Sequence, residues 1–305
     1  MSTYIVKALT QEERPTLGKF YETVALDKKV VFWWIGSEEN WENVICAFEN
    51  GEMIAKGQVQ VVNTIPDGHP PSSKHKIYLN LKTLPDRETD VELLNSVYDK
   101  LYERALVLKQ ELSPNYETDF CVGNFGTEVN NNCYFLEEKG FKPQNTLYTM
   151  ERDLTQPIVN IEFPESELRW NYWSMETAQE EKQYLDAECI IWPDIALGYN
   201  RLREYKNHNY WTAITVWGND DIIASVMAWE KEGIGVIEDV FVMKQWRKHG
   251  IARFLLTTAL TYLNEKGLSE AELMVDTANE KALNLYKSVG FEVVEVEKRF
   301  YTELV

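Results

Sequence analysis

The sequence repeats itself, and this internal repeat limits the folds that the chain can adopt. The segment FLEEKGFKPQNTLYTMERDL at residues 135–154 matches LYKSVGFEVVEVEKRFYTEL at residues 285–304, with a constant offset of 150. The turns AFENGEMIA and TVWGNDDIIA align between the same halves. A repeat of this length predicts two copies of one domain rather than a single large fold. The 305 residues leave room for two domains of ordinary size.

Hydrophobic periodicity predicts the same elements in both halves: strand, helix, hairpin, strand, long helix, strand, short helix and strand. In the first half, the short apolar run Val30–Ile35 is expected to form a strand, and Asn50-Gly51 is expected to turn a hairpin. The proline-containing segment from Thr155 to Pro164 is the expected linker. The predicted domains are therefore residues 1–155 and residues 165–305.

Composition excludes several classes of protein. The net charge of −18 argues against a nucleic-acid-binding protein, which would present a basic face. Four scattered histidines have no metal-ligand spacing, so we expect no metal site. The chain shows no signal-peptide pattern and no apolar run near 18 residues, so we expect a cytoplasmic protein without a membrane partner. It could be a monomer or a homodimer.

The stretch from Gly233 to Leu263 carries the clearest functional signal. An apolar run containing Glu238 and Asp239 is followed by the basic turn Arg247-Lys248-His249-Gly250-Ile251-Ala252 and by a helical pattern. That pattern places apolar residues at spacings of three and four, at Ile251, Leu255, Leu256, Ala259, Leu260 and Leu263. The first amides of a helix have no partner inside it and carry partial positive charge. A strand, a glycine-containing basic turn and a helix therefore predict a phosphate site.

Two motifs in the second half resemble those of the GNAT family of N-acetyltransferases. The spacing Arg-x-x-Gly-x-Ala, from Arg247 to Ala252, resembles the family's acyl-CoA pyrophosphate motif. The run from Asn279 to Phe291 resembles the second signature, Asn-x-x-Ala-x-x-Leu-Tyr-x-x-x-Gly-Phe. The order of elements resembles GNAT domains in both halves. The resemblance implies an α/β fold with two tandem domains, each a mostly antiparallel mixed sheet flanked by helices, with a splayed central strand pair.

The resemblance also implies where the donor acetyl-CoA binds. In GNAT proteins the strand before the motif splays from its neighbour, and its free amides hold the pantetheine arm. Transferred to this sequence, the donor-binding residues are Val240, Phe241, Val242, Arg247, Lys248, His249, Gly250, Ile251, Ala252, Arg253 and Asn279. The basic ones could instead form a solvated turn, and Asn279 could simply cap a helix.

Three residues are candidates for proton transfer. Tyr286 is the candidate general acid, because a phenol with a pKa near 10 is protonated at neutral pH and can protonate a thiolate. It could also be an ordinary core aromatic. Glu238 and Asp239 are candidates for the base that deprotonates an ammonium, with Glu238 favoured because it shares the side of Val240 and Val242. Either acid could instead pair with a basic residue of a neighbouring strand.

The first half lacks the donor motif. The segment Leu84-Pro85-Asp86-Arg87-Glu88-Thr89-Asp90 occupies the slot of Arg247–Ala252 and carries acids, which repel a diphosphate. Leu136 stands at the position of Tyr286. We therefore expect a degenerate first domain that binds no acyl-CoA.

These patterns predict an N-acetyltransferase that moves the acetyl group of acetyl-CoA directly to a primary amine of a small molecule or peptide. The break Trp192-Pro193-Asp194 and the nearby aromatic residues favour a cationic acceptor. Two alternatives are a non-catalytic acyl-CoA-binding or sensing module and, with less support, an aminoacyl transferase.

Overall fold

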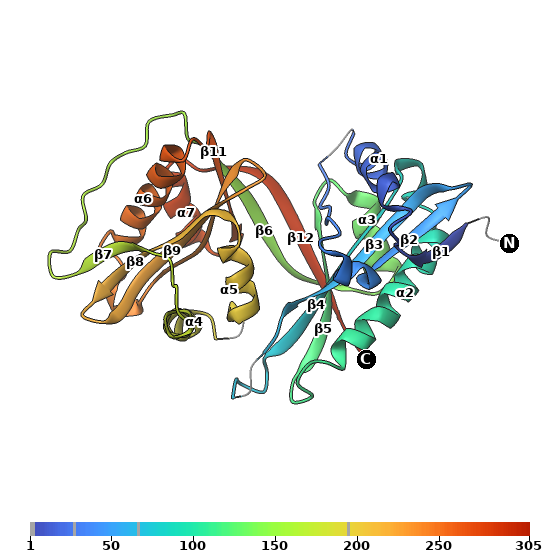
Figure 1. The fold of residues 1–305 in the computed structure, drawn as a ribbon, viewed down its shortest axis with the longest axis horizontal. Helices are drawn as coiled ribbons and strands as arrows, with labels where there is room; N and C mark the ends of the chain where they lie inside the picture. The colour runs from blue at the N-terminus through green and yellow to red at the C-terminus, as the bar shows by residue number, and fades with distance from the viewer. Residues whose placement is uncertain (1–3, 27–28, 66–67, 194–195) are drawn as a thin grey trace. The chain divides into compact units, whose positions relative to one another are not determined.

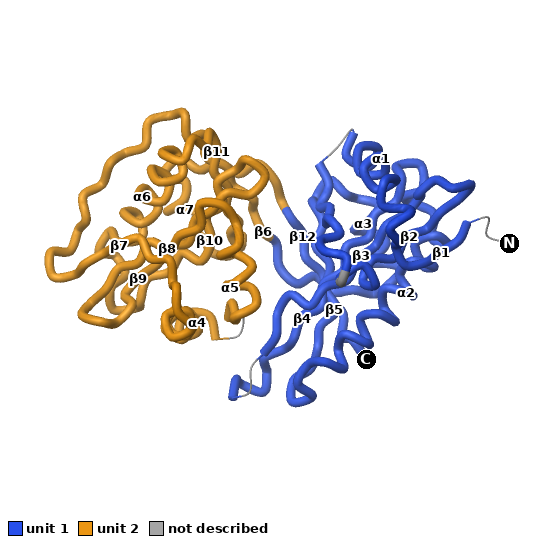
Figure 2. The backbone as a smooth tube through the Cα atoms, viewed as in Figure 1, with its two compact units in different colours: residues 1–146, 297–305 blue, residues 147–296 orange. Residues whose placement is uncertain are grey.

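The computed structural model describes residues 4–26, 29–65, 68–193 and 196–305 (Figure 1). The chain forms two compact units (Figure 2). Unit 1 comprises residues 1–146 and 297–305, and unit 2 comprises residues 147–296. Asp194, a residue of the predicted acceptor pocket, lies outside the described residues.

Unit 1 is a mixed sheet with helices. Its sheet has the order β1-β2-β3-β4-β5-β12, in which only β4 and β5 run parallel. Its elements are β1 (Ile5–Ala8), α1 (Arg14–Val24), η1 (Glu38–Asn43), β2 (Val44–Glu49), β3 (Glu52–Asn63), β4 (Lys74–Thr83), η2 (Pro85–Arg87), α2 (Val91–Lys109), β5 (Glu117–Phe125), α3 (Val129–Cys133), η3 (Tyr134–Glu138) and part of β12 (Glu292–Glu303).

Unit 2 has the same plan. Its sheet has the order β6-β11-β10-β9-β8-β7, in which only β10 and β11 run parallel. Its elements are part of β6 (Lys142–Asp153), β7 (Arg169–Trp173), α4 (Ala178–Ile191), α5 (Gly198–Lys206), β8 (Asn209–Gly218), β9 (Asp221–Lys231), β10 (Ile234–Val242), η4 (Lys244–Trp246), α6 (Ile251–Glu265), β11 (Glu270–Asp276) and α7 (Glu280–Ser288).

The two repeats exchange a strand. Residues 147–153 of β6 belong to the first repeat, yet they pair with β11 in unit 2. Residues 297–303 of β12 belong to the second repeat, yet they pair with β5 in unit 1. The predicted ranges 1–155 and 165–305 follow the sequence repeat, whereas each compact unit takes one strand from the other repeat.

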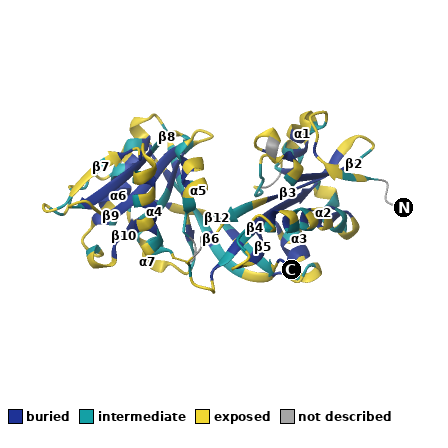
Figure 3. Ribbon diagram, turned by 60° about the horizontal axis from the view of Figure 1, so that its bottom comes forward, coloured by how far each residue is buried: buried dark blue, intermediate teal, exposed yellow. Residues whose placement is uncertain are grey.

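Each unit buries a long helix against its sheet, and buried positions follow the strands (Figure 3). The helical pattern predicted from Ile251 is confirmed, because all six of its apolar positions are buried. On the opposite side of the unit 2 sheet, α4 and α5 contribute Tyr184, Leu185, Leu202 and Tyr205 to a second apolar cluster. In the described part of the chain, no helix combines the length and apolarity needed to cross a membrane.

The strand predicted at Val30–Ile35 is wrong. Residues 29–36 form no strand and have no strand pairing. Side chains hold their backbone instead: Asn80 Nδ2 donates to Val31 O (2.7 Å), Glu128 Oε1 accepts from Val31 N (2.8 Å), and Lys56 Nζ donates to Trp33 O. An apolar run predicts a strand from its own composition, but it cannot show that distant polar side chains will take its hydrogen bonds.

Candidate active site

Strand β10 departs from its parallel neighbour in the middle of the unit 2 sheet. It pairs with β11 only at Gly235 and Val236, although it continues to Val242. On its other side it stays paired with β9, with a bulge between Glu238 and Phe241. Within the bulge, Asp239 has a φ of +55°, a conformation uncommon for residues other than glycine. The backbone edge of residues 240–242 on the β11 side is therefore not paired with β11.

The turn after β10 leads into an uncapped helix. Arg247 Nε donates to Val242 O (3.0 Å), which ties the turn to the strand. Gly250 is the N-cap of α6, with a φ of +84° that favours glycine, and no side chain caps the helix. The first helical hydrogen bond runs from Phe254 N to Gly250 O (3.0 Å), so the amides of residues 251–253 precede it. Free amides and the helix dipole make this end of α6 suited to an anion.

A cavity of about 520 Å³ connects the strand, the turn and two helices. The predicted residues that line it are Val240, Phe241, Val242, Arg247, Lys248, Gly250, Ile251, Ala252, Arg253, Asn279 and Tyr286. Sequence reasoning missed Lys281, which also lines the cavity from the first turn of α7. The sequence feature that could have identified Lys281 is its position two residues after Asn279, the N-cap of α7. Lys281 adds a fourth cation to Arg247, Lys248 and Arg253.

The structure places His249 outside the lining of this cavity. Its Nδ1 lies 2.7 Å from Glu165 Oε1, on the segment that precedes β7. The neighbouring Pro164 lies 3.9 Å from the position that a Cβ of Gly250 would take. The side chain of His249 is thus engaged by a carboxylate of its own unit.

Tyr286 lies on α7, whose N-cap Asn279 accepts a hydrogen bond from Ala282 N (3.2 Å). Its side chain is buried, lines the cavity and packs edge-on against Phe291. Burial, with the negative charges of Glu238 and Asp239, raises the pKa of Tyr286 far above its usual range. The phenol therefore keeps its proton at any pH near neutral.

The two candidate bases differ in their surroundings. Burial raises the pKa of Asp239 to about 7, and the charge of Glu238 adds to the shift. Tyr184 of α4 donates a hydrogen bond to Asp239 Oδ2, which moderates the increase. Neither acid lines the cavity, but Phe241, two residues after Asp239, does. The raised pKa of Asp239 suits proton exchange at neutral pH. The preference for Glu238 stays a prediction.

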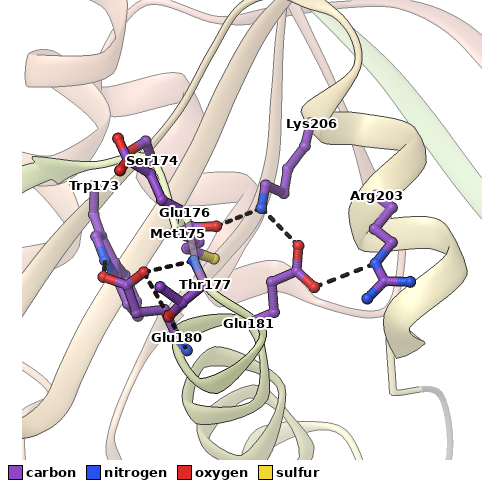
Figure 4. A network of polar contacts seen from close by, with 9 residues as sticks. All are labelled: Trp173, Ser174, Met175, Glu176, Thr177, Glu180, Glu181, Arg203 and Lys206. Carbon is purple, nitrogen blue, oxygen red and sulfur yellow. Dashed lines mark hydrogen bonds and ion pairs between the residues drawn. The ribbon is translucent and has the colours of Figure 1, made fainter.

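A polar network fixes the start of α4 against α5 (Figure 4). Thr177 and Glu180 form a capping box at the first turn of α4. Glu181 accepts from Lys206 Nζ (2.6 Å) and Arg203 Nε (3.3 Å), and Lys206 also donates to Met175 O. Tyr184 lies one turn after Glu181 on the same face, so this network holds the helix in the position from which Tyr184 meets Asp239.

The family model described as "Acetyltransferase (GNAT) family" matches residues 166–291, the part of the chain that builds this cavity. Residues 166–291 belong to the GNAT family. The chain also resembles individual curated proteins, and each of these matches covers only part of it.

An uncharacterised N-acetyltransferase of Methanocaldococcus jannaschii is 36% identical over 69 residues, 23% of this chain and 30% of that protein. A [ribosomal protein bS18]-alanine N-acetyltransferase of Haemophilus ducreyi is 28% identical over 115 residues, 38% of this chain and 75% of that protein. This chain therefore spans less than a third of the length of the first relative.

Solved structures match the whole chain. A GNAT protein from Sphaerobacter thermophilus has a TM-score of 0.76 at 16% identity, covering 100% of this chain and 96% of that one. A tandem GNAT protein from the clavulanic acid biosynthesis pathway has a TM-score of 0.67 at 10% identity, covering 99% of each chain. At these identities the likeness shows the fold alone, and it confirms the predicted tandem GNAT fold.

Unit 1 has the GNAT plan, but its corresponding helix end is closed. Asp90 caps α2 by accepting from Leu93 N (3.0 Å), which places a carboxylate where α6 has free amides. Arg87, in the preceding turn, pairs with Asp90 (3.1 Å) and with Glu49. The one basic residue of this turn is therefore neutralised by acids of its own unit.

Buried polar side chains also fill the end of the central strand pair in unit 1. The parallel pairing of β4 with β5 covers Lys74–Leu79 and Glu117–Val122, and β4 then continues to Thr83. Beyond the pairing, Lys82 Nζ contacts Glu128 Oε2 and donates to Asn124 Oδ1 (2.8 Å), and all three side chains are buried.

In the described residues, we also find no group of three His, Cys, Asp or Glu side chains able to hold a metal ion.

Proposed function

We propose that unit 2 is an N-acetyltransferase that transfers the acetyl group of acetyl-CoA to a primary amine of a small molecule or peptide. One observation carries the proposal: the uncapped N-terminus of α6 opens into the cavity that Tyr286 lines. The family membership of residues 166–291 supports it.

The donor would be held by backbone and charge. The amides of residues 251–253 and the cations Lys248, Arg253 and Lys281 suit a diphosphate. The backbone edge of Val240–Val242, which β11 leaves unpaired, suits the amide groups of a pantetheine arm. Acetyl-CoA would supply an activated thioester carbonyl.

Two residues would move the protons. Asp239, with its pKa of about 7, would accept a proton from the acceptor ammonium, directly or through water. The amine nitrogen then bonds to the acetyl carbon, the carbon–sulfur bond breaks, and Tyr286 donates its proton to the departing thiolate. The second proton of the acylated nitrogen would return to the Tyr286 oxygen, directly or through water, which leaves the amide, the free thiol and a protonated Asp239. The thiol pKa of Cys189 is raised by burial, which favours direct attack over a cysteine-bound intermediate.

Unit 1 would act as a scaffold in this proposal. Its helix end is occupied by Asp90 and the end of its strand pair by Lys82, Asn124 and Glu128. We therefore propose one donor site in each chain.

The test is release of free thiol from acetyl-CoA in the presence of a panel of primary amines. We expect amine-dependent release by the wild type, and a decrease in kcat of about 10- to 1,000-fold in Tyr286→Phe. A Phe291→Leu variant alters the aromatic neighbour of Tyr286 without removing the hydroxyl and serves as the control. Binding of acetyl-CoA without amine-dependent release would instead show a non-catalytic acyl-CoA-binding module.

A further inference from the structure

A buried arginine of β6 lies at the end of α7 and has no part in the mechanism above. Arg152 is only 8% exposed. Its guanidinium donates hydrogen bonds to the backbone carbonyl oxygens of Asp153, Gln156 (3.5 Å), Pro157 (2.9 Å) and Val289 (3.2 Å). A buried cation needs such partners, because its removal from water is costly. One side chain therefore joins the end of β6, the start of the linker and the end of α7.

The helix that Arg152 contacts is the one that carries Tyr286. Val289 is the C-cap of α7, and the last carbonyl groups of a helix have no partner inside it. The helix dipole also puts partial negative charge at this end, which favours a cation. Tyr286 is in the last turn, and its own carbonyl oxygen accepts from Val289 N and Phe291 N, both at 3.1 Å. Arg152 therefore holds the same turn that carries the phenol.

Gly290, the residue after the C-cap, leaves the space that the guanidinium occupies. It has a φ of +93°, a conformation that favours glycine. A Cβ at this position would lie 2.6 Å from Arg152 Nε, which is closer than these atoms can approach. Both the backbone of the turn and the contact with Arg152 therefore require glycine here.

The first repeat lacks this arrangement around its own short helix. At the offset of 150, Gly140 takes the place of Gly290 and also has a positive φ, of +66°, but no described atom lies within 4 Å of the position of its Cβ. Thr302 takes the place of Arg152, and Leu136 that of Tyr286. The arginine contact thus occurs in the unit that has the tyrosine and not in the unit that lacks it.

We propose that Arg152 is a positioning residue, which holds the last turn of α7 so that the Tyr286 phenol keeps its place in the donor cavity. This inference rests on the proposed function, in which Tyr286 protonates the departing thiolate. By sequence Arg152 belongs to the first repeat, although its strand completes the sheet of unit 2. The repeat without a donor motif therefore has a defined part in the reaction, because it supplies the side chain that fixes the general acid.

Substitution of the arginine should separate turnover from donor binding. Arg152→Gln removes the charge and most of the donors, and kcat in the thiol-release assay should fall about 10- to 100-fold, because a small displacement of the general acid is enough for such a loss. The Kd of acetyl-CoA in calorimetry should be unchanged, because the donor is held at α6. Arg152→Lys keeps a cation at the helix end and should restore part of the lost activity.

A double-mutant cycle distinguishes this role from a general loss of structure. Because Arg152 acts through Tyr286, Arg152→Gln should lower kcat no further in a Tyr286→Phe background. An equal further decrease in that background would overturn the proposal, since the arginine would then act without the tyrosine.

A second variant tests the same contact should Arg152→Gln fail to fold. Gly290→Ala keeps the arginine but places a Cβ against its guanidinium, so it should reproduce the loss in kcat. Gly140→Ala is the matched control, because it adds the same methyl group at a positive φ where the space is open. Its kcat should equal that of the wild type. Wild-type kcat in folded Gly290→Ala would contradict the proposal.

A third readout does not require turnover. A 3-fluorotyrosine is incorporated at Tyr286 in the full chain, and its ¹⁹F signal reports the surroundings of the phenol. The signal should shift or broaden in Arg152→Gln and Gly290→Ala but not in Gly140→Ala, with wild-type circular dichroism throughout. An unchanged signal in folded Arg152→Gln would overturn the proposal. If the signal responds as expected but the wild type releases no thiol, the proposed function fails and the anchoring of Tyr286 remains.

Discussion

A single core substitution in β12 tests the exchange of strands between the repeats. Phe300 lies in the second sequence repeat, but it is only 4% exposed in the core of unit 1, opposite Val122 of β5. Phe300→Ala should therefore destabilise unit 1 and leave unit 2 intact. A division of the chain at the repeat boundary predicts the reverse.

The magnitude follows from the burial of the side chain. Removing a buried phenylalanine typically costs about 3–5 kcal/mol, because both transfer energy and packing are lost. At about 1.4 kcal/mol for each factor of ten, amides that exchange through opening of unit 1 should exchange about 10²- to 10⁴-fold faster. Amides of unit 2 should keep their wild-type rates.

Hydrogen–deuterium exchange with peptide resolution measures both units in one experiment. Peptides from α2 report on unit 1 and peptides from α6 report on unit 2. Met150→Ala is the reciprocal variant, because Met150 belongs to the first repeat but is fully buried in the core of unit 2. It should accelerate α6 and not α2. The reasoning is refuted if Phe300→Ala accelerates exchange in α6 while α2 remains protected.

Three further predictions concern single interactions. Glu128→Gln removes the carboxylate charge that contacts the buried Lys82 ammonium and should destabilise unit 1 by about 3 kcal/mol in urea unfolding, whereas Glu138→Gln at an exposed site should stay within about 0.5 kcal/mol. Asp90→Ala removes the N-cap of α2 and should lower the unfolding free energy of unit 1 by about 1 kcal/mol in the same assay. An unchanged unfolding free energy would mean that the first amides of α2 are satisfied without the Asp90 side chain. The pKa of Glu188 is raised on folding to about 8, so its contribution to stability is complete below the unfolded value near 4.3 and is lost as pH rises through about 8. Calorimetry should therefore show that Glu188→Gln loses less stability than the wild type between pH 5 and pH 9, and parallel curves would contradict this assignment.

Local patterns predicted most of the candidate site. The turn from Arg247 to Ala252 and the helix from Asn279 are local segments, in which the positions of the residues depend on a few neighbouring dihedral angles. Both were therefore recognised from the spacing of residues in the sequence. The apolar face of α6 was predicted, for the same reason, from the helical period of its apolar residues. Lys281 was missed although it belongs to such a segment, because a charged residue in a first helical turn is also typical of a solvated surface.

Contacts between distant residues could not be predicted from these patterns. Nothing local shows that Tyr184 approaches Asp239, and the preference for Glu238 arose from strand alternation, which the bulge at Asp239 interrupts. The repeat likewise predicted two sheets but not which sheet each last strand would join. A strand carries the same alternation whether it completes its own repeat or the other one.

The central claim is that the free amides at the N-terminus of α6 hold the donor, at one site in each chain. Calorimetric titration with acetyl-CoA tests it directly in the wild type, Gly250→Glu and Gly267→Glu. Gly250 and Gly267 have φ values of +84° and +86° at opposite ends of α6, so both variants carry similar backbone strain and the same added charge. We expect one site per chain, an affinity at least about 100-fold weaker in Gly250→Glu, and near wild-type affinity in Gly267→Glu. Two sites per chain, no binding heat in the wild type, or an unchanged affinity in Gly250→Glu would contradict the claim.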